Sequence, residues 1–222
     1  MRSRSPARCS HLITILLALR AARVHHGLVD ADQVAALRIL LEPSSWLQET
    51  RTFARALRRS VSRTSSGLLI VGTPDEEPWH LAAHLDQESR LAGIPGLAPT
   101  LVRWAPPPGA PPHLRVGLTR LEEARRGETL FVVSPEAAPA PLLERVHDAR
   151  RVGATIMAMD AGDPDLEDMA HECLNVDPGL APVSFDAAQH LVSAAAGEPA
   201  QSRGPLIASR ARASRARMPA RD

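Results

Sequence analysis

The amino-acid sequence predicts an α/β fold: a doubly wound, mainly parallel sheet with helices on both faces, preceded by N-terminal helices. Three short and continuously apolar segments, at 67–72, 129–134 and 154–159, favour this fold. Strands buried on both faces read as unbroken apolar runs, without the alternation of a half-exposed strand. Helical segments separate these runs, and such alternation is typical of parallel sheets. We expect the three strands to be parallel and central.

Residues 1–65 are interpreted as an N-terminal helical extension. Apolar residues recur at helical spacing over 11–26, 30–41 and 45–63, which predicts three helices. In the last of these, Trp46, Phe53 and Leu57 share an apolar stripe, and arginines occupy the opposite face. We do not expect a single sheet domain to cover all of these stripes, so self-association is a further expectation.

Residues 66–197 are expected to form the α/β domain itself. The proline-rich stretch at 105–112 should be an extended loop, because proline offers no amide donor and fixes its own backbone. Ser184 is placed as the N-cap of the closing helix. Besides the three central strands, the pattern predicts two further strands, at 100–104 and 173–176, and five helices, at 76–92, 118–126, 139–152, 165–171 and 184–196.

Bulk composition excludes some classes of function. The 222 residues include 26 basic and 25 acidic ones, a net charge of +1 that indicates no general affinity for nucleic acid. Only the arginine-rich tail at 198–222, expected to be disordered, could contact it. No apolar run is long enough for a membrane span. The two cysteines have no CxxC spacing, so the sequence predicts neither a disulfide nor a zinc site. This cysteine usage favours a reducing, cytoplasmic location.

Candidate ligand-binding residues follow from the topology. In open α/β sheets, ligands bind beyond the carboxyl ends of the strands. The loops after the three central strands begin at Gly72, Ser134 and Asp160. We therefore take Gly72, Thr73, Ser134 and Asp160 as candidate ligand-binding residues.

Other polar patterns are interpreted as structural. The acids at 75–77 fit the first turn of the helix at 76–92, where they would complement its dipole. His80 and His84 are four residues apart, so one helix face could present both to a metal, with Glu76 or Glu77 as a third ligand. Two surface histidines are the favoured interpretation. The aspartates at 160–168 lack the spacing of a calcium loop and fit loop and cap positions better.

No catalytic residue is assigned from these patterns. Ser134 is followed by Pro135 and has no neighbouring base in sequence, which a nucleophile needs. We accordingly expect no metal and no cofactor, and we expect catalysis on phosphosugars to be absent or very weak.

Segments of the chain resemble the sugar isomerase (SIS) domain family. At 121–134, Leu-Glu-Glu-Ala-Arg-Arg-Gly-Glu-Thr-Leu-Phe-Val-Val-Ser resembles the short helix, Gly-acid pair and strand that lead into the second strand of SIS domains. The segments at 149–159 and 165–176 resemble the helix, Gly-Ala and strand, and then the small helix and short strand, of the same family. The resemblance covers about 130 residues and lies in the order of the helices and strands along the chain.

The phosphate-binding loops depart from the family pattern. The family's G-x-G-x-S loop is here Gly72-Thr-Pro-Asp-Glu-Glu-Pro, and its S-x-S-G-x-T loop is Ser134-Pro-Glu-Ala-Ala-Pro-Ala. Only Gly72, Thr73 and Ser134 match. A small uncharacterised SIS-like family with a Gly-Thr first loop shows a similar loss, and this chain resembles it.

The resemblance implies three classes of function. The first is binding of a small phosphorylated or carbohydrate-derived metabolite without catalysis. The second is an assembly or interaction protein that retains the fold. The third is a phosphosugar isomerase, for which His171 and His190 are conceivable bases. The resemblance also implies a homo-oligomer, since SIS-like domains commonly pair.

Overall fold

The computed structural model describes residues 31–41, 45–63, 67–177, 179 and 181–198. The helix expected at 11–26 lies outside these residues, as does the expected disordered tail apart from Glu198. Within the described residues, no helix is both long enough and apolar enough to cross a membrane.

The described residues contain a five-stranded, entirely parallel sheet with strand order β2-β1-β3-β4-β5. The three strands expected at its centre are adjacent and parallel, so that prediction is confirmed. Both edge strands were also predicted. The strands are β1 (Leu68–Val71), β2 (Pro99–Val102), β3 (Thr129–Ser134), β4 (Thr155–Asp160) and β5 (Glu172–Asn175).

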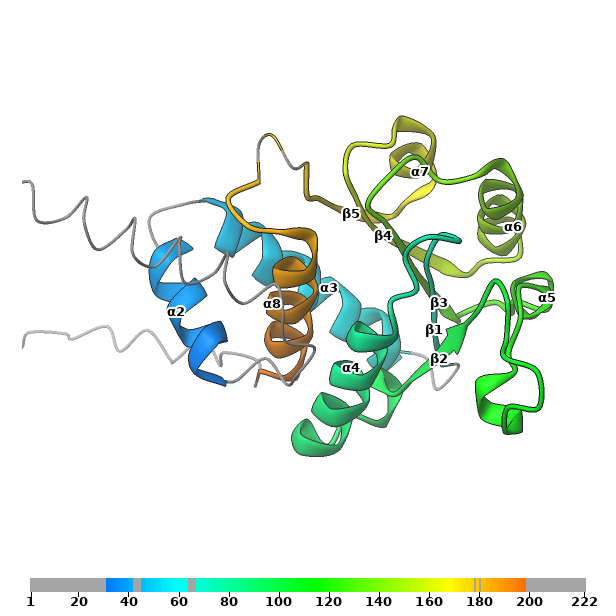
Figure 1. The fold of residues 1–222 in the computed structure, drawn as a ribbon, viewed down its shortest axis with the longest axis horizontal. Helices are drawn as coiled ribbons and strands as arrows, with labels where there is room; N and C mark the ends of the chain where they lie inside the picture. The colour runs from blue at the N-terminus through cyan, green and yellow to red at the C-terminus, as the bar shows by residue number, and fades with distance from the viewer. Residues whose placement is uncertain (1–30, 42–44, 64–66, 178, 180, 199–222) are drawn as a thin grey trace, which may run out of the picture.

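Helices cover both faces of the sheet, giving the three-layer α/β arrangement predicted from the sequence (Figure 1). Chain order alternates strand and helix from β1 onward, as expected for parallel strands joined by helical crossovers, and β1 lies between β2 and β3. On one face lie α2 (Ala31–Leu41), α3 (Ser45–Arg63), α4 (Trp79–Ala92) and α8 (Phe185–Gly197). On the other lie α5 (Thr119–Glu122), α6 (Ala140–Arg151) and α7 (Pro164–Met169).

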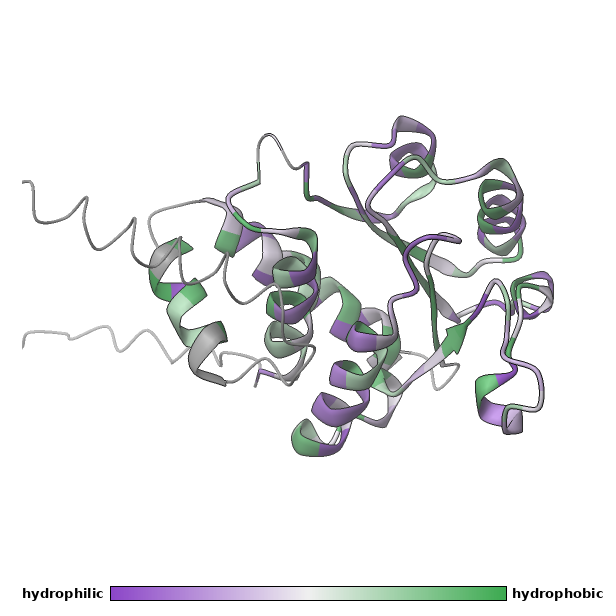
Figure 2. Ribbon diagram, in the orientation of Figure 1, coloured by the Kyte–Doolittle hydropathy of each residue, from purple (hydrophilic) through white to green (hydrophobic). Residues whose placement is uncertain are grey.

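Helix α3 belongs to the core of the sheet domain. Phe53 and Leu57 are 3% and 0% exposed, and the Phe53 ring lies 5.4 Å from the ring of Phe131 on β3. The apolar stripe of α3 is therefore buried within the same chain, and it no longer supplies a reason for self-association. Figure 2 shows both apolar and polar residues along α4, as expected for a helix with one face on the core.

Two helices begin or end three or more residues inside their predicted bounds. Helix α4 begins at Trp79 rather than 76, because the preceding loop folds back over the end of β1, with the Glu76 carbonyl against Gly72. Helix α5 ends at Glu122. The Arg125 amide donates to the Glu128 carboxylate at 2.8 Å instead of to a helical carbonyl, so the helix does not continue.

Two single turns of 3-10 helix were not predicted, η2 (Pro95–Leu97) and η3 (Pro112–Leu114). Both begin with proline, whose fixed φ suits the first position of a helical turn. The proline-rich loop thus ends in a short helical turn at its last residue.

Candidate functional site

The candidate ligand-binding residues gather at the carboxyl edge of the sheet, as the topology predicted. Ser134 and Asp160 are paired in register at the ends of β3 and β4. Gly72 and Thr73 follow the end of β1, the other neighbour of β3. Ser134 and Asp160 are fully buried and Thr73 is 6% exposed, so these side chains lie beneath the surface at the carboxyl edge of the sheet.

The loop after β1 closes tightly over the strand end. The Thr73 hydroxyl oxygen accepts a hydrogen bond from the Glu76 amide at 3.1 Å, and the Trp104 indole donates to the Gly72 carbonyl at 2.7 Å. A Cβ at position 72 would lie 1.8 Å from the Glu76 carbonyl oxygen. Only glycine therefore fits at this strand end in its present conformation.

The side chains of Ser134 and Asp160 form hydrogen bonds with nearby backbone groups. The Ser134 hydroxyl donates to the Glu136 carbonyl at 2.7 Å. One Asp160 carboxylate oxygen accepts from the amides of Gly162 and Asp163, at 2.7 and 3.1 Å. The Ser134 hydroxyl therefore donates within its own loop rather than toward a ligand, unlike a hydroxyl in a loop built to hold a phosphate.

The acids after β1 do not act as the sequence predicted. No acid stands in the first turn of α4, so their expected role beside the helix dipole is wrong. Instead, Glu77 forms an ion pair with Arg103, with Nη2 2.8 Å from Oε2, and this contact raises the pKa of Arg103. The Gln189 amide donates to the Glu76 carboxylate at 3.3 Å, which joins α8 to the loop after β1.

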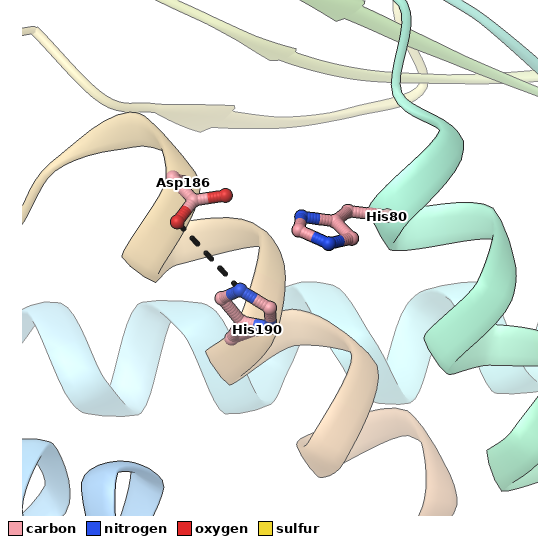
Figure 3. A group of neighbouring side chains, drawn as sticks. All are labelled: His80, Asp186 and His190. Carbon is pink, nitrogen blue, oxygen red and sulfur yellow. Dashed lines mark ion pairs between the residues drawn. The ribbon is translucent and has the colours of Figure 1, made fainter. Parts of the chain in front are cut away.

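A second polar cluster lies between α4 and α8 (Figure 3). His80 and His84 come from α4, and Asp186 and His190 come from α8, each pair being one helical turn apart. The ring centroid of His190 lies 5.8 Å from that of His80 and 4.7 Å from that of His84. His80 and His84 are half-buried, and both face a neighbouring helix.

Two groups of this cluster, Asp186 and His84, have lowered pKa values. The nearby His190 imidazole holds the pKa of Asp186 below its usual value. Burial lowers the pKa of His84, and the neighbouring imidazoles of His190 and His80 lower it further. Neutral imidazoles and an ionised carboxylate are the protonation states in which these groups bind a cation.

Sequence reasoning found only half of this cluster. It paired His80 with His84 and placed Glu76 or Glu77 beside them, whereas the structure brings His80 to Asp186 and His190. The four-residue spacing of Asp186 and His190 was a detectable signal that one helix face carries both. The contact between α4 and α8 is tertiary and has no local signature.

His171 lies elsewhere. Its Nδ1 accepts a hydrogen bond from the amide of Ile156, near the amino end of β4 and at 2.9 Å. This position is at the opposite edge of the sheet from Ser134 and Asp160. His171 is therefore not a base for chemistry at the carboxyl edge.

No family model matches the chain, and no curated protein matches it. Solved structures of similar fold include a proposed phosphosugar isomerase from Silicibacter pomeroyi, at 16% identity and a TM-score of 0.47 over 74% of this chain and 47% of that one. They also include the sugar isomerase domain of an RpiR transcription factor from Sphaerobacter thermophilus, at 18% identity and a TM-score of 0.46 over 72% and 88%.

A third similar structure is the NanR protein of Vibrio vulnificus in complex with ManNAc-6P, at 11% identity and a TM-score of 0.39 over 81% of this chain and 69% of that one. The chain spans about half the length of the Silicibacter protein. At these identities the likeness is one of fold alone.

Proposed function

We propose that this chain binds a small carbohydrate-derived or phosphorylated metabolite at the carboxyl edge of its sheet, without turning it over. The observation that carries the proposal is a buried polar group at that edge. Gln189 is 3% exposed, and its carbonyl oxygen makes no hydrogen bond with any described residue. Buried polar atoms are almost always satisfied, so a ligand hydroxyl group is a suitable donor for this one.

The position of Gln189 supports the same proposal. Its amide contacts Glu76 in the loop after β1, and this loop borders the edge where parallel sheets bind ligands. A sugar hydroxyl both donates and accepts, so it can satisfy the Gln189 carbonyl and a neighbouring carboxylate together. The acids of the edge disfavour a doubly charged phosphate, so we expect the sugar moiety to dominate recognition.

The hydrogen bonds of the edge residues support the proposed absence of turnover. Ser134 donates its proton to a backbone carbonyl rather than to a base. Asp160 is fully buried and accepts hydrogen bonds through both carboxylate oxygens, which leaves no reactive oxygen toward solvent. General acid–base chemistry needs a group within hydrogen-bond reach of the substrate.

A thermal-shift panel tests the proposal. It comprises free hexoses, N-acetylhexosamines, their 6-phosphates and inorganic phosphate. A ligand at 100 times its Kd adds about 2.7 kcal/mol to the free energy of unfolding, and should raise Tm by roughly 5 °C or more. Gln189→Met, which keeps the shape and removes the amide, should reduce this shift.

The matched control is Gln87→Met, at an exposed position of α4. It should leave the ligand-induced shift unchanged. A panel in which no sugar derivative raises Tm would argue against ligand binding, and an equal shift in Gln189→Met and the wild type would argue against this site.

One observation favours an assembly role as a second candidate. Ile39 on α2 and Leu91 on α4 are each 73% exposed. A large apolar side chain at such exposure becomes buried when it contributes to an interface between copies. Leu91→Glu should lower the sedimentation coefficient if this surface joins two copies, and it should have no effect on a monomer.

A further inference from the structure

We propose that His80, Asp186 and His190 form a binding site for a divalent transition metal ion of the zinc type. One ligand atom from each of the three side chains lies within 4.8 Å of the other two. The side chains project toward one another from two packed helices (Figure 3). Such a convergence of two imidazoles and one carboxylate matches a ligand set found in catalytic zinc sites.

His190 supplies the second observation. It is 4% exposed, and its Nε2 makes no hydrogen bond with any described residue. The same nitrogen is 3.7 Å from the Asp186 carboxylate, which is too long for a hydrogen bond. The two groups are within ion-pair distance, but a buried nitrogen without a hydrogen bond is costly, and a metal ion between the two would satisfy both.

The distances suit a site that closes on its metal. With ligand bonds of about 2.0–2.1 Å, the ligand atoms of a tetrahedral zinc site lie about 3.3–3.4 Å apart. The separation of His190 and Asp186, 3.7 Å, is already near this value. His190 is held in the core, whereas Asp186 is exposed and His80 is half-buried, so small rotations of these two side chains can complete the site.

The ligand types select the metal. Imidazole nitrogens suit zinc, copper, iron and nickel, whereas magnesium and calcium prefer oxygen ligands throughout. Two neutral imidazoles and one carboxylate leave a net charge of +1 on a bound divalent ion, which the site can hold near the protein surface. Three protein ligands also leave the fourth tetrahedral position open to water or to an anionic ligand.

Neighbouring rings hold the two histidines in place. The His84 ring packs edge-on against the His190 ring, at 4.7 Å and 78°. The Trp79 ring lies 3.9 Å from the His80 ring and shields one side of it. Groups around a metal site commonly orient its ligands in this way, so these two residues are assigned a positioning role.

Zinc titration of the metal-free full-length chain tests the proposal, near neutral pH and with a competing chelator. We expect one equivalent of Zn²⁺ to bind tightly. His80→Ala and Asp186→Asn lie at accessible positions and should leave the fold intact, yet each should weaken Zn²⁺ binding by at least about 100-fold, above the range seen for residues that only orient ligands. The matched control is His147→Ala, at an exposed position of α6, which should not change the affinity.

Substitution of Co²⁺ gives a second readout. A site of nitrogen and oxygen ligands should show the visible bands of tetrahedral cobalt without a thiolate charge-transfer band, whereas a thiolate band would assign the metal to a cysteine and overturn the proposal. Zinc affinity that is equal in the wild type and in a His80→Ala, Asp186→Asn double variant would overturn it too, as would no binding by the wild type. The test contains no sugar, so its result is independent of the proposed ligand function.

Discussion

The thiol of Cys173 donates a hydrogen bond to the carboxylate of Asp160, with Sγ 2.9 Å from Oδ2. The contact joins the end of β4 to its neighbour β5 at the carboxyl edge of the sheet. Burial and this hydrogen bond raise the pKa of the Cys173 thiol far above its usual value, because both disfavour the thiolate. Cys173 is thus a free cysteine of low reactivity, although its residue is exposed overall.

Asp160→Asn should speed the alkylation of Cys173. The asparagine keeps an oxygen for the amides of Gly162 and Asp163 but removes the negative charge beside the sulfur. Each unit by which the pKa falls raises the thiolate fraction roughly tenfold at a fixed pH below the pKa. Iodoacetamide labelling followed by peptide mass spectrometry measures the rate at Cys173 alone.

Glu167→Gln is the comparison for that measurement. Its charge also raises the Cys173 pKa, but it is the smallest of the contributions, so labelling should speed up less than in Asp160→Asn. Equal labelling rates in Asp160→Asn and the wild type would show that the hydrogen bond does not control the thiol.

Gly72→Ala should destabilise the protein. A Cβ there would lie 1.8 Å from the Glu76 carbonyl oxygen and 2.6 Å from Pro78 Cδ, so the loop after β1 must shift. Overpacking of this kind costs about 1–3 kcal/mol of the free energy of unfolding. Gly117→Ala is the control, because its nearest contact would be an ordinary 3.7 Å, and it should change stability by less than about 0.5 kcal/mol. Urea unfolding measures both, and a neutral Gly72→Ala would mean that the loop is pliable.

The strands could be predicted because their signal is local. An unbroken apolar run such as 129–134 is buried on both faces wherever it is placed in a parallel sheet, and β3 has the predicted bounds. The caps at Asp163 and Ser184 were equally readable, since a side chain and the amides that it caps are only a few residues apart.

The remaining features depend on contacts between distant segments. Helix α4 starts late because the preceding loop folds back on Gly72. The apolar stripe of α3 packs into the core of the same chain, but its spacing alone could not distinguish this core from a partner surface. The candidate edge was predictable because topology brings the ends of β1, β3 and β4 together. The cluster of His80, Asp186 and His190 was not, because residues more than 100 positions apart meet there only through the packing of α4 on α8.

Asp163→Ala should cost more than the loss of an ordinary helix cap. One carboxylate oxygen caps α7 by accepting from the amides of Asp165 and Leu166, at 3.0 and 3.2 Å. The other accepts from the Ala138 amide, before α6, at 2.6 Å. Loss of the cap and of a buried acceptor should cost about 2–4 kcal/mol of the free energy of unfolding.

Two further variants separate these contributions. Asp163→Asn keeps an oxygen for α7 but turns an amide group toward Ala138, so its cost should be intermediate. Ser184→Ala removes one exposed cap bond, to the Ala187 amide at 3.2 Å, and should cost about 0.5–2 kcal/mol. An Asp163→Ala variant no less stable than Ser184→Ala would show that the link to Ala138 contributes nothing.

The Glu88 carboxyl group should make the stability of the folded protein depend on pH, in a direction that its pKa defines. Burial raises the pKa of its carboxyl group above the usual 4.5, against the opposing effect of Arg38. A carboxyl group whose pKa is raised by folding favours the folded state most when protonated. Its favourable contribution is complete below the unfolded pKa and is lost as the pH rises through the folded pKa.

Glu88→Gln should therefore gain stability relative to the wild type as the pH rises. The amide mimics the protonated acid at every pH, so the difference in Tm between variant and wild type should increase from acid to neutral pH. Taking the difference cancels the titration of the other groups. Asp86→Asn, on the same helix and paired with Arg90 at the surface, is the control, because removing an exposed ion pair should change Tm little. A Tm difference for Glu88→Gln that stays constant or falls toward neutral pH would show that burial does not raise this pKa, since only a raised pKa makes the charged carboxylate unfavourable in the folded state.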